Sequence, residues 1–174
     1  MTGRRRANLA PAMVARSTNS VTRELGEDEL PAWRGFLRAH AHLTRELDAN
    51  LRETHSLSLS AYDVLVQLAG EPNHKMRMSD LAESVVLTPS GLTRLVDKLC
   101  REGLVEREEC SDDARGSFAV LTEVGARRFA EARPTHLDGV RRLFLSQFSP
   151  QELRSLGEAW ERVAANGANG ARPS

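Results

Sequence analysis

The apolar residues of this chain recur mostly at the three- and four-residue intervals of amphipathic helices, which predicts a mainly α-helical protein. The first such segment, 30–54, keeps a broad apolar face over many turns, as helices do that pack against more than their own domain. Two short stretches, 104–107 and 117–121, have instead the composition of strands. The expected helices are residues 30–54, 60–70, 78–85, 89–102, 122–146 and 150–165.

The rest of the chain is organised around residues 88–103. Thr88 is expected to cap a helix with its hydroxyl, and Pro89 then occupies the first helical position, where its missing N–H costs nothing. Gly103 supplies the left-handed residue that ends the helix. One face of this helix is apolar and carries Leu92, Leu95, Val96 and Leu99.

The opposite face of the same helix is polar. It has small and hydrogen-bonding residues near the N-terminal end and longer cations further along: Ser90, Gly91, Thr93, Arg94, Asp97, Lys98 and Arg101. A helix that enters a DNA major groove end-on needs this arrangement, because its first turns meet base edges and its flanks meet phosphates.

The neighbouring segments extend this interpretation. Only two residues separate the expected helix 78–85 from Thr88, and two helices joined by so short a turn are typical of a helix-turn-helix. The strands 104–107 and 117–121 flank a polar turn and predict a hairpin, after which Thr122 caps the next helix. Helix, turn, helix and hairpin is the order of a winged helix.

These pieces together resemble the MarR family of bacterial transcriptional regulators. The resemblance rests on residues 90–99, 102–107, 113–116 and 120–122 in that order, and it extends over about residues 30–163. It implies a mainly α fold, in which a winged helix-turn-helix domain with a two-stranded β wing is flanked by long N- and C-terminal helices that form a helical dimerisation domain. The expected divisions are a basic, disordered arm 1–28, a dimerisation helix 29–58, the DNA-binding domain 59–122, dimerisation helices 123–165 and a disordered tail 166–174.

The resemblance also implies partners and contacts. We expect a homodimer that binds double-stranded DNA at a pseudo-palindromic operator, with half-sites roughly 10 base pairs apart. The expected DNA-binding residues are Thr88, Ser90, Gly91, Thr93 and Arg94 near the bases, Lys98 and Arg101 at phosphates, and Arg115 in the minor groove. Asp113 and Gly116 are expected to support the wing. Most regulators of this type are repressors, and many release DNA when a small aromatic acid or phenol binds.

A ligand pocket is expected where the first helix faces the start of the second. Its residues would be Trp33, His40, Tyr62 and Asp63, an aromatic floor with a few polar groups. Asp63 also has a purely structural explanation, because it forms a capping box with Ser60. No metal site is expected here, since His40 and His42 do not share a helix face.

Composition narrows the remaining alternatives. The net charge is zero, so bulk charge argues neither for nor against nucleic acid, although Arg4, Arg5 and Arg6 could form an arm along the DNA backbone. The chain has no membrane span or signal-peptide core, and its cysteines form no metal or redox motif, so we expect a cytoplasmic protein without a cofactor.

Two other classes of function stay open at this point. The first is a thiol switch at Cys100 or Cys110, although acidic neighbours of Cys110 would blunt its reactivity. The second is a non-catalytic helical interaction module. An enzyme is not expected, because the sequence has no nucleophile–base pair and no phosphate-binding glycine loop.

Overall fold

The computed structural model describes residues 24–85, 87–109 and 116–170, with side chains as far as residue 165. The long helices are α1 (Glu29–His55), α5 (Glu123–Leu143) and α6 (Pro150–Gly170). The shorter ones are α2 (Leu59–Gly70), α3 (Met78–Ser84) and α4 (Pro89–Arg101), with 3-10 turns η1 (Pro72–His74) and η2 (Leu145–Gln147). The strands are β1 (Lys75–Arg77), β2 (Val105–Glu109) and β3 (Ser117–Leu121). The mainly α winged-helix prediction is confirmed.

Three helices begin where the sequence predicts. The Thr88 hydroxyl accepts from the Gly91 amide at 3.1 Å, and the Thr122 hydroxyl accepts from the Gly125 amide at 3.0 Å. At α6, Ser149 and Glu152 form the predicted capping box, in which each side chain accepts from the other residue's backbone N–H. At the far end of α4, Gly103 has φ of +69°, the left-handed conformation that stops the helix.

The predicted start of the second helix is wrong. The cap of α2 is Ser58, whose hydroxyl accepts from the Ala61 amide at 3.2 Å, rather than Ser60. Asp48 on α1 accepts from the Leu59 amide at 2.9 Å, so a carboxylate from another helix satisfies a second free N–H. Asp63 is therefore not needed as a capping residue.

The sheet has one strand more than predicted. Its order is β1-β3-β2 and neighbouring strands are antiparallel. Ala119 on the central strand β3 pairs with Met76 of β1 on one side and with Arg107 of β2 on the other. The strand β1 places Lys75 and Arg77 beside the wing, next to the aromatic ring of Phe118. A hydrophobic core under the sheet joins α2, α3 and α4, and its fully buried residues include Leu65, Leu68, Leu81, Leu92, Val96, Leu99 and Ala119.

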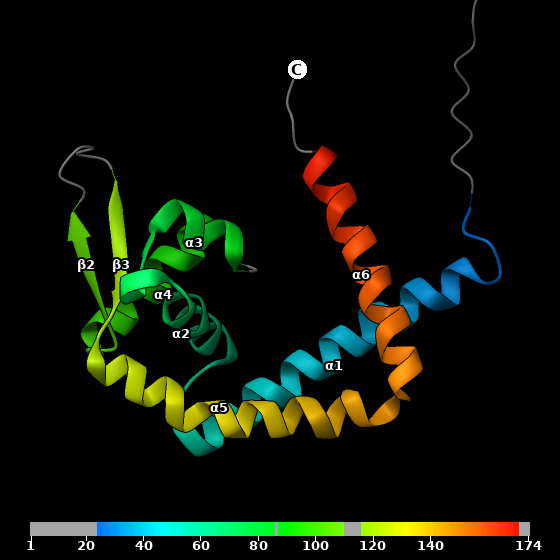
Figure 1. The fold of residues 1–174 in the computed structure, drawn as a ribbon, viewed down its shortest axis with the longest axis horizontal. Coiled ribbons are helices and arrows are strands. Elements are labelled where there is room, and N and C mark those ends of the chain that lie inside the picture. Colours follow the sequence, from blue (N-terminus) through cyan, green and yellow to red (C-terminus); the bar gives the residue numbers. More distant parts are fainter. Residues whose placement is uncertain (1–23, 86, 110–115, 171–174) are drawn as a thin grey trace, which may run out of the picture.

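The long helices lie outside this core. Figure 1 shows α5 leaving the wing, changing direction along its length and then running beside α1, with α6 crossing α1 at the far end. Pro134 lies inside α5, and an interior proline removes a helical hydrogen bond and bends the axis. The helix α6 continues past Ala165, the predicted end, to Gly170. In the described part of the chain, no helix is long and apolar enough to cross a membrane.

Candidate nucleic-acid interface and an adjoining cavity

The helix α4 has two contrasting faces. Leu92, Val96 and Leu99 are fully buried against the domain core, because they recur at helical spacing. The residues predicted to contact DNA lie on the other side, where Thr88, Ser90, Thr93, Arg94, Lys98 and Arg101 are exposed and Gly91 is half-buried. The predicted set is thus brought together on one solvent-facing surface, which we call the α4 face.

The N-terminal end of the α4 face offers hydroxyl groups. Thr93 donates its hydroxyl to the carbonyl of Pro89 at 3.0 Å, and the hydroxyls of Thr88 and Ser90 lie 3.4 Å apart. Backbone N–H groups at a helix N-terminus carry partial positive charge, so this end of the helix favours anions.

The cations of the α4 face differ in their partners. Lys98 lies 3.6 Å from Glu102, one turn further along the helix. Arg94 and Arg101 form no ion pair or hydrogen bond with any described residue. Their guanidinium groups are therefore available to an external anion, and guanidinium binds phosphates and guanine edges in bidentate fashion.

An ion pair ties α4 to the wing. The Arg107 guanidinium on β2 lies 2.9 Å from the Asp97 carboxylate on α4, and both side chains are half-exposed. This pairing could not be predicted from the sequence, because the two residues come from different elements. Burial raises the pKa of the Cys100 thiol beside them, which keeps the thiol protonated and argues against a reactive switch at this position.

The base of the wing carries two further cations. The Lys75 ammonium lies 4.4 Å from the Phe118 ring centre and pairs with Glu108, and the Arg77 guanidinium lies 5.3 Å from the same ring. Gly116 is half-buried next to β3. The predicted wing residues Asp113 and Arg115, like Cys110, lie outside the described residues.

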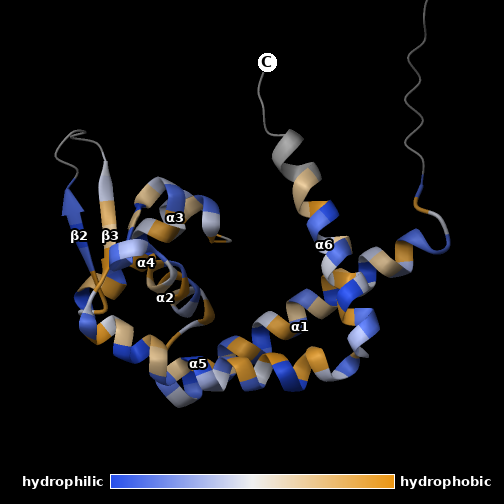
Figure 2. Ribbon diagram, viewed as in Figure 1, coloured by the Kyte–Doolittle hydropathy of each residue, from blue (hydrophilic) through white to orange (hydrophobic). Residues whose placement is uncertain are grey.

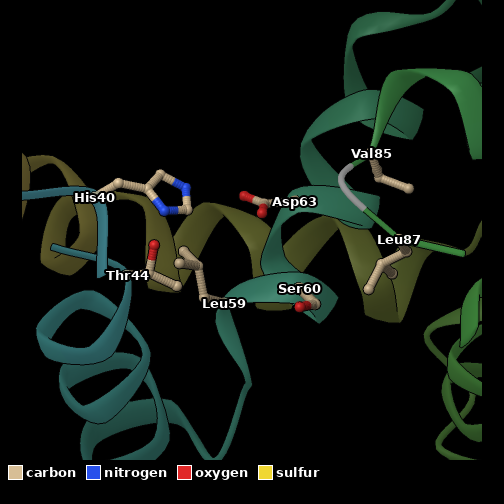
Figure 3. A pocket seen from close by; sticks show the side chains of 7 residues that line it. All are labelled: His40, Thr44, Leu59, Ser60, Asp63, Val85 and Leu87. Carbon is tan, nitrogen blue, oxygen red and sulfur yellow. The ribbon is translucent and has the colours of Figure 1, made fainter. Parts of the chain in front are cut away.

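A cavity of about 240 Å³ adjoins the helix-turn-helix (Figure 3). We call it the α1–α2 cavity. The residues that line it come from α1, from the start of α2 and from the connection between α3 and α4: His40, Thr44, Leu59, Ser60, Asp63, Val85 and Leu87. Figure 3 shows the His40 ring and the Asp63 carboxylate pointing toward each other across the cavity.

Only half of the predicted pocket residues converge there. His40 and Asp63 line the cavity. The Tyr62 ring is instead buried against α5, where its centre lies 4.5 Å from that of the His136 ring and 5.7 Å from that of the Phe129 ring. Trp33 is exposed and stacks on Phe36, with 5.8 Å between the two ring centres. The prediction of Tyr62 and Trp33 as pocket residues is therefore wrong for the α1–α2 cavity.

The electrostatics of Asp63 are unusual for a surface acid. Burial raises the pKa of its carboxyl group, because an ionised carboxylate loses hydration there. No hydrogen bond or ion pair joins Asp63 to another described residue. The described residues also contain no group of three or more side chains that could hold a metal ion.

Comparisons with known proteins identify the family to which this chain belongs. A sequence model of the MarR family matches residues 55–116. The structure of AbsC, a MarR family transcriptional regulator from Streptomyces coelicolor, is 35% identical with a TM-score of 0.78, over 85% of this chain and 99% of AbsC. The chain belongs to the MarR family.

Other MarR-family relatives agree with this assignment. Sco3205 from Streptomyces coelicolor, whose structure is a complex with DNA, is 35% identical with a TM-score of 0.78, over 87% of this chain and 93% of Sco3205. The transcriptional repressor YetL of Bacillus subtilis is 27% identical over 112 residues, which span 62% of this chain and 66% of YetL. In this MarR-family chain the α4 face is therefore part of the winged helix-turn-helix that such regulators share.

Proposed function

We propose that the protein is a transcriptional regulator that binds double-stranded DNA sequence-specifically through α4. The carrying observation is the α4 face, on which Arg94 and Arg101 are exposed without an ion-pair partner among the described residues, at the outer side of a helix that is otherwise firmly packed. The complex of the relative Sco3205 with DNA supports the same role.

The proposed contacts follow the geometry of the helix. Its first turns, with Thr88, Ser90, Gly91, Thr93 and Arg94, would meet base edges and the nearest phosphates, because the N-terminal end of a recognition helix enters the groove. Lys98 and Arg101 would contact phosphates. Arg115 would enter the minor groove, with Asp113 and Gly116 supporting the wing; for Arg115 and Asp113 this proposal rests on the sequence alone.

We also propose that the functional unit is a homodimer on a pseudo-palindromic operator, and that it represses by occupying that site. Exposed aromatic residues on α1 and α6, including Trp33 and Trp160, support an interface there. Two-fold symmetry then requires half-sites about one helical turn, roughly 10 base pairs, apart.

The α1–α2 cavity is the proposed control point. Val85 and Leu87 belong to the connection that precedes α4, so a molecule in the cavity contacts both the dimerisation helix and the helix-turn-helix. A ligand that binds one arrangement of these two parts more tightly shifts the population toward it and so changes DNA affinity.

The decisive experiment is substitution of Arg94 by Ala. The operator is first selected from a random duplex library with the intact chain, and binding is then measured by anisotropy. We expect Arg94→Ala to weaken operator binding by about 1–3 kcal/mol, with an unchanged melting temperature, because this exposed side chain has no partner among the described residues.

The matched control is Arg127→Ala on α5. Arg127 is also an exposed arginine, but it pairs with Glu123 at 3.9 Å and lies off the α4 face. Operator affinity should be unaffected by this change. Equal affinities of the Arg94→Ala variant and the intact chain would contradict the assignment of α4 to the groove.

A further inference from the structure

We propose that the α1–α2 cavity binds a small organic cation, such as a primary arylalkylamine, in preference to an aromatic acid. The proposal names the ligand class of the control point described above, and its regulatory meaning rests on that proposed function. The binding itself follows from the residues that line the cavity and can be tested without DNA.

The first observation is the unpaired carboxylate. Asp63 is half-buried, faces into the cavity, and has no hydrogen bond or ion pair to another described residue. A carboxylate that has lost part of its hydration gains most from a cation that also donates hydrogen bonds. A bound ammonium group would supply both the missing charge and the missing donors.

The second observation concerns what the cavity does not offer to an acid. The seven described residues that line it include no lysine or arginine, so a ligand carboxylate would meet no guanidinium or ammonium group among them. The same ligand would instead bring a second negative charge next to Asp63. Two neighbouring negative charges in a partly buried site repel each other, and this repulsion disfavours the binding of aromatic acids.

The third observation is the mixed character of the walls. Leu59, Val85 and Leu87 supply apolar surface suited to an aromatic ring. The His40 ring, on α1, lies opposite Asp63, so an ammonium group held by Asp63 would also lie next to the imidazole ring. A volume of about 240 Å³ accommodates a single ring with a short arm.

The arrangement also explains why Asp63 is placed on α2 without a structural partner. The helix α2 is already capped by Ser58 and by the Asp48 carboxylate. An asparagine or a threonine would serve the fold equally well at position 63 and would avoid the cost of a partly desolvated charge.

The test uses three probes with one ring and different head groups: benzylamine, benzyl alcohol and benzoate. Calorimetry on the full chain measures their dissociation constants in the absence of DNA. We expect benzylamine to bind about tenfold more tightly than benzyl alcohol, because a hydrogen bond to a charged group is stronger than a neutral one, and benzoate to bind least.

Two variants locate the effect. Asp63→Asn keeps the size of the side chain and should abolish the preference for benzylamine without lowering the melting temperature of the ligand-free protein. Asp138→Asn, at an exposed acid of α5 that pairs with Arg141 at 3.0 Å, should keep the preference.

Several results would overturn the proposal. They are tighter binding of benzoate than benzylamine, an unaltered preference in Asp63→Asn, and no binding of benzylamine at millimolar concentration. Stabilisation by Zn²⁺ that is lost in both Asp63→Asn and His40→Ala would assign the cavity to a metal instead. Operator binding is measured in a separate experiment. If the intact chain binds no operator, the proposed function is contradicted, whereas the ligand class inferred for the cavity is unaffected.

Discussion

At Gly125 the chain has no room for a side chain. A Cβ atom there would lie 2.1 Å from the Leu104 carbonyl oxygen and 2.7 Å from a methyl group of Leu121. Because the first of these neighbours is backbone, α5 would have to move away from the wing. We expect Gly125→Ala to lower the free energy of unfolding by about 1–3 kcal/mol or more, measured by urea denaturation.

The control for this prediction is Gly157→Ala on α6. A Cβ at Gly157 would meet no described heavy atom within 4 Å apart from its own stretch of helix, and alanine favours the helix over glycine by roughly 0.5–1 kcal/mol. This variant should be as stable as the intact chain or slightly more stable. Equal stability of both variants would show that the contact of α5 with the wing is not tight in solution.

His136 makes the stability depend on pH. Its Nδ1 atom is buried and has no hydrogen-bond partner among the described residues, and burial lowers the pKa of the ring below the usual 6.5. The unfolded chain therefore binds more protons than the folded chain as the pH falls through about 6.5, so this histidine reduces stability on acidification. Replacement by phenylalanine should remove that contribution, because the ring can still pack on Tyr62.

The measurement is urea unfolding at about pH 7.5 and at about pH 5.5. The intact chain should lose more stability between the two values than His136→Phe. A variant His136→Phe with an unchanged pH dependence would refute the prediction.

At the scale of elements, local signals were predictable and tertiary ones were not. The helix α4 begins and ends where Thr88 and Gly103 indicate, because a hydroxyl cap and a left-handed stop depend only on neighbours in sequence. The start of α2 was mispredicted because both Ser58 and Ser60 offer a capping hydroxyl, and the Asp48 carboxylate that binds the Leu59 amide at the actual start comes from another helix. The strand β1 was missed because three residues show no alternation and pair only with the distant β3.

The candidate sites divide in the same way. The exposed α4 face follows from helical periodicity alone, which is why its residues were found together. The cavity was only half predicted, because consecutive residues on a helix point about 100° apart. With Asp63 facing the cavity, Tyr62 must face the core against His136.

The ion pair between α4 and the wing permits a test of how the two elements are held. Arg107→Ala should cost less than about 1 kcal/mol of stability, since the pair is half-exposed, yet weaken operator binding by freeing the wing relative to α4. Exchanging the charges, Asp97→Arg with Arg107→Asp, should restore part of the lost affinity. The two single variants each change the free energy of operator binding, and the sum of these changes predicts an affinity for the double variant. If the double variant binds no more tightly than this sum predicts, the ion pair does not position the wing.

At the scale of the whole molecule, the apolar surface is distributed unevenly. The buried core belongs to the winged domain, whereas α1 contributes only Leu51 to its fully buried residues. Orange, apolar positions recur along α1, α5 and α6 in Figure 2. An apolar groove of about 410 Å³ runs between α1 and the α5–α6 end and is lined by Phe36, Leu43, Phe144, Phe148, Leu156 and Trp160. A monomer rarely leaves a surface of this kind uncovered.

The last prediction is that a second copy of the chain covers this groove. Trp33, Phe36 and Trp160 remain 51%, 39% and 43% exposed, and the rings of Phe36 and Trp160 lie 5.2 Å apart at the crossing of α1 and α6.

A glutamate at Phe36 would place a charge in the centre of the proposed interface, where burying it without a partner costs several kcal/mol. We expect Phe36→Glu to convert a dimer into a monomer in light scattering at micromolar concentration. Val124→Glu, at a similarly exposed residue on α5 beside the wing, should remain dimeric. If the intact chain is itself a monomer under these conditions, the groove is not a dimer interface. The proposal of a homodimer on a pseudo-palindromic operator would then be contradicted as well.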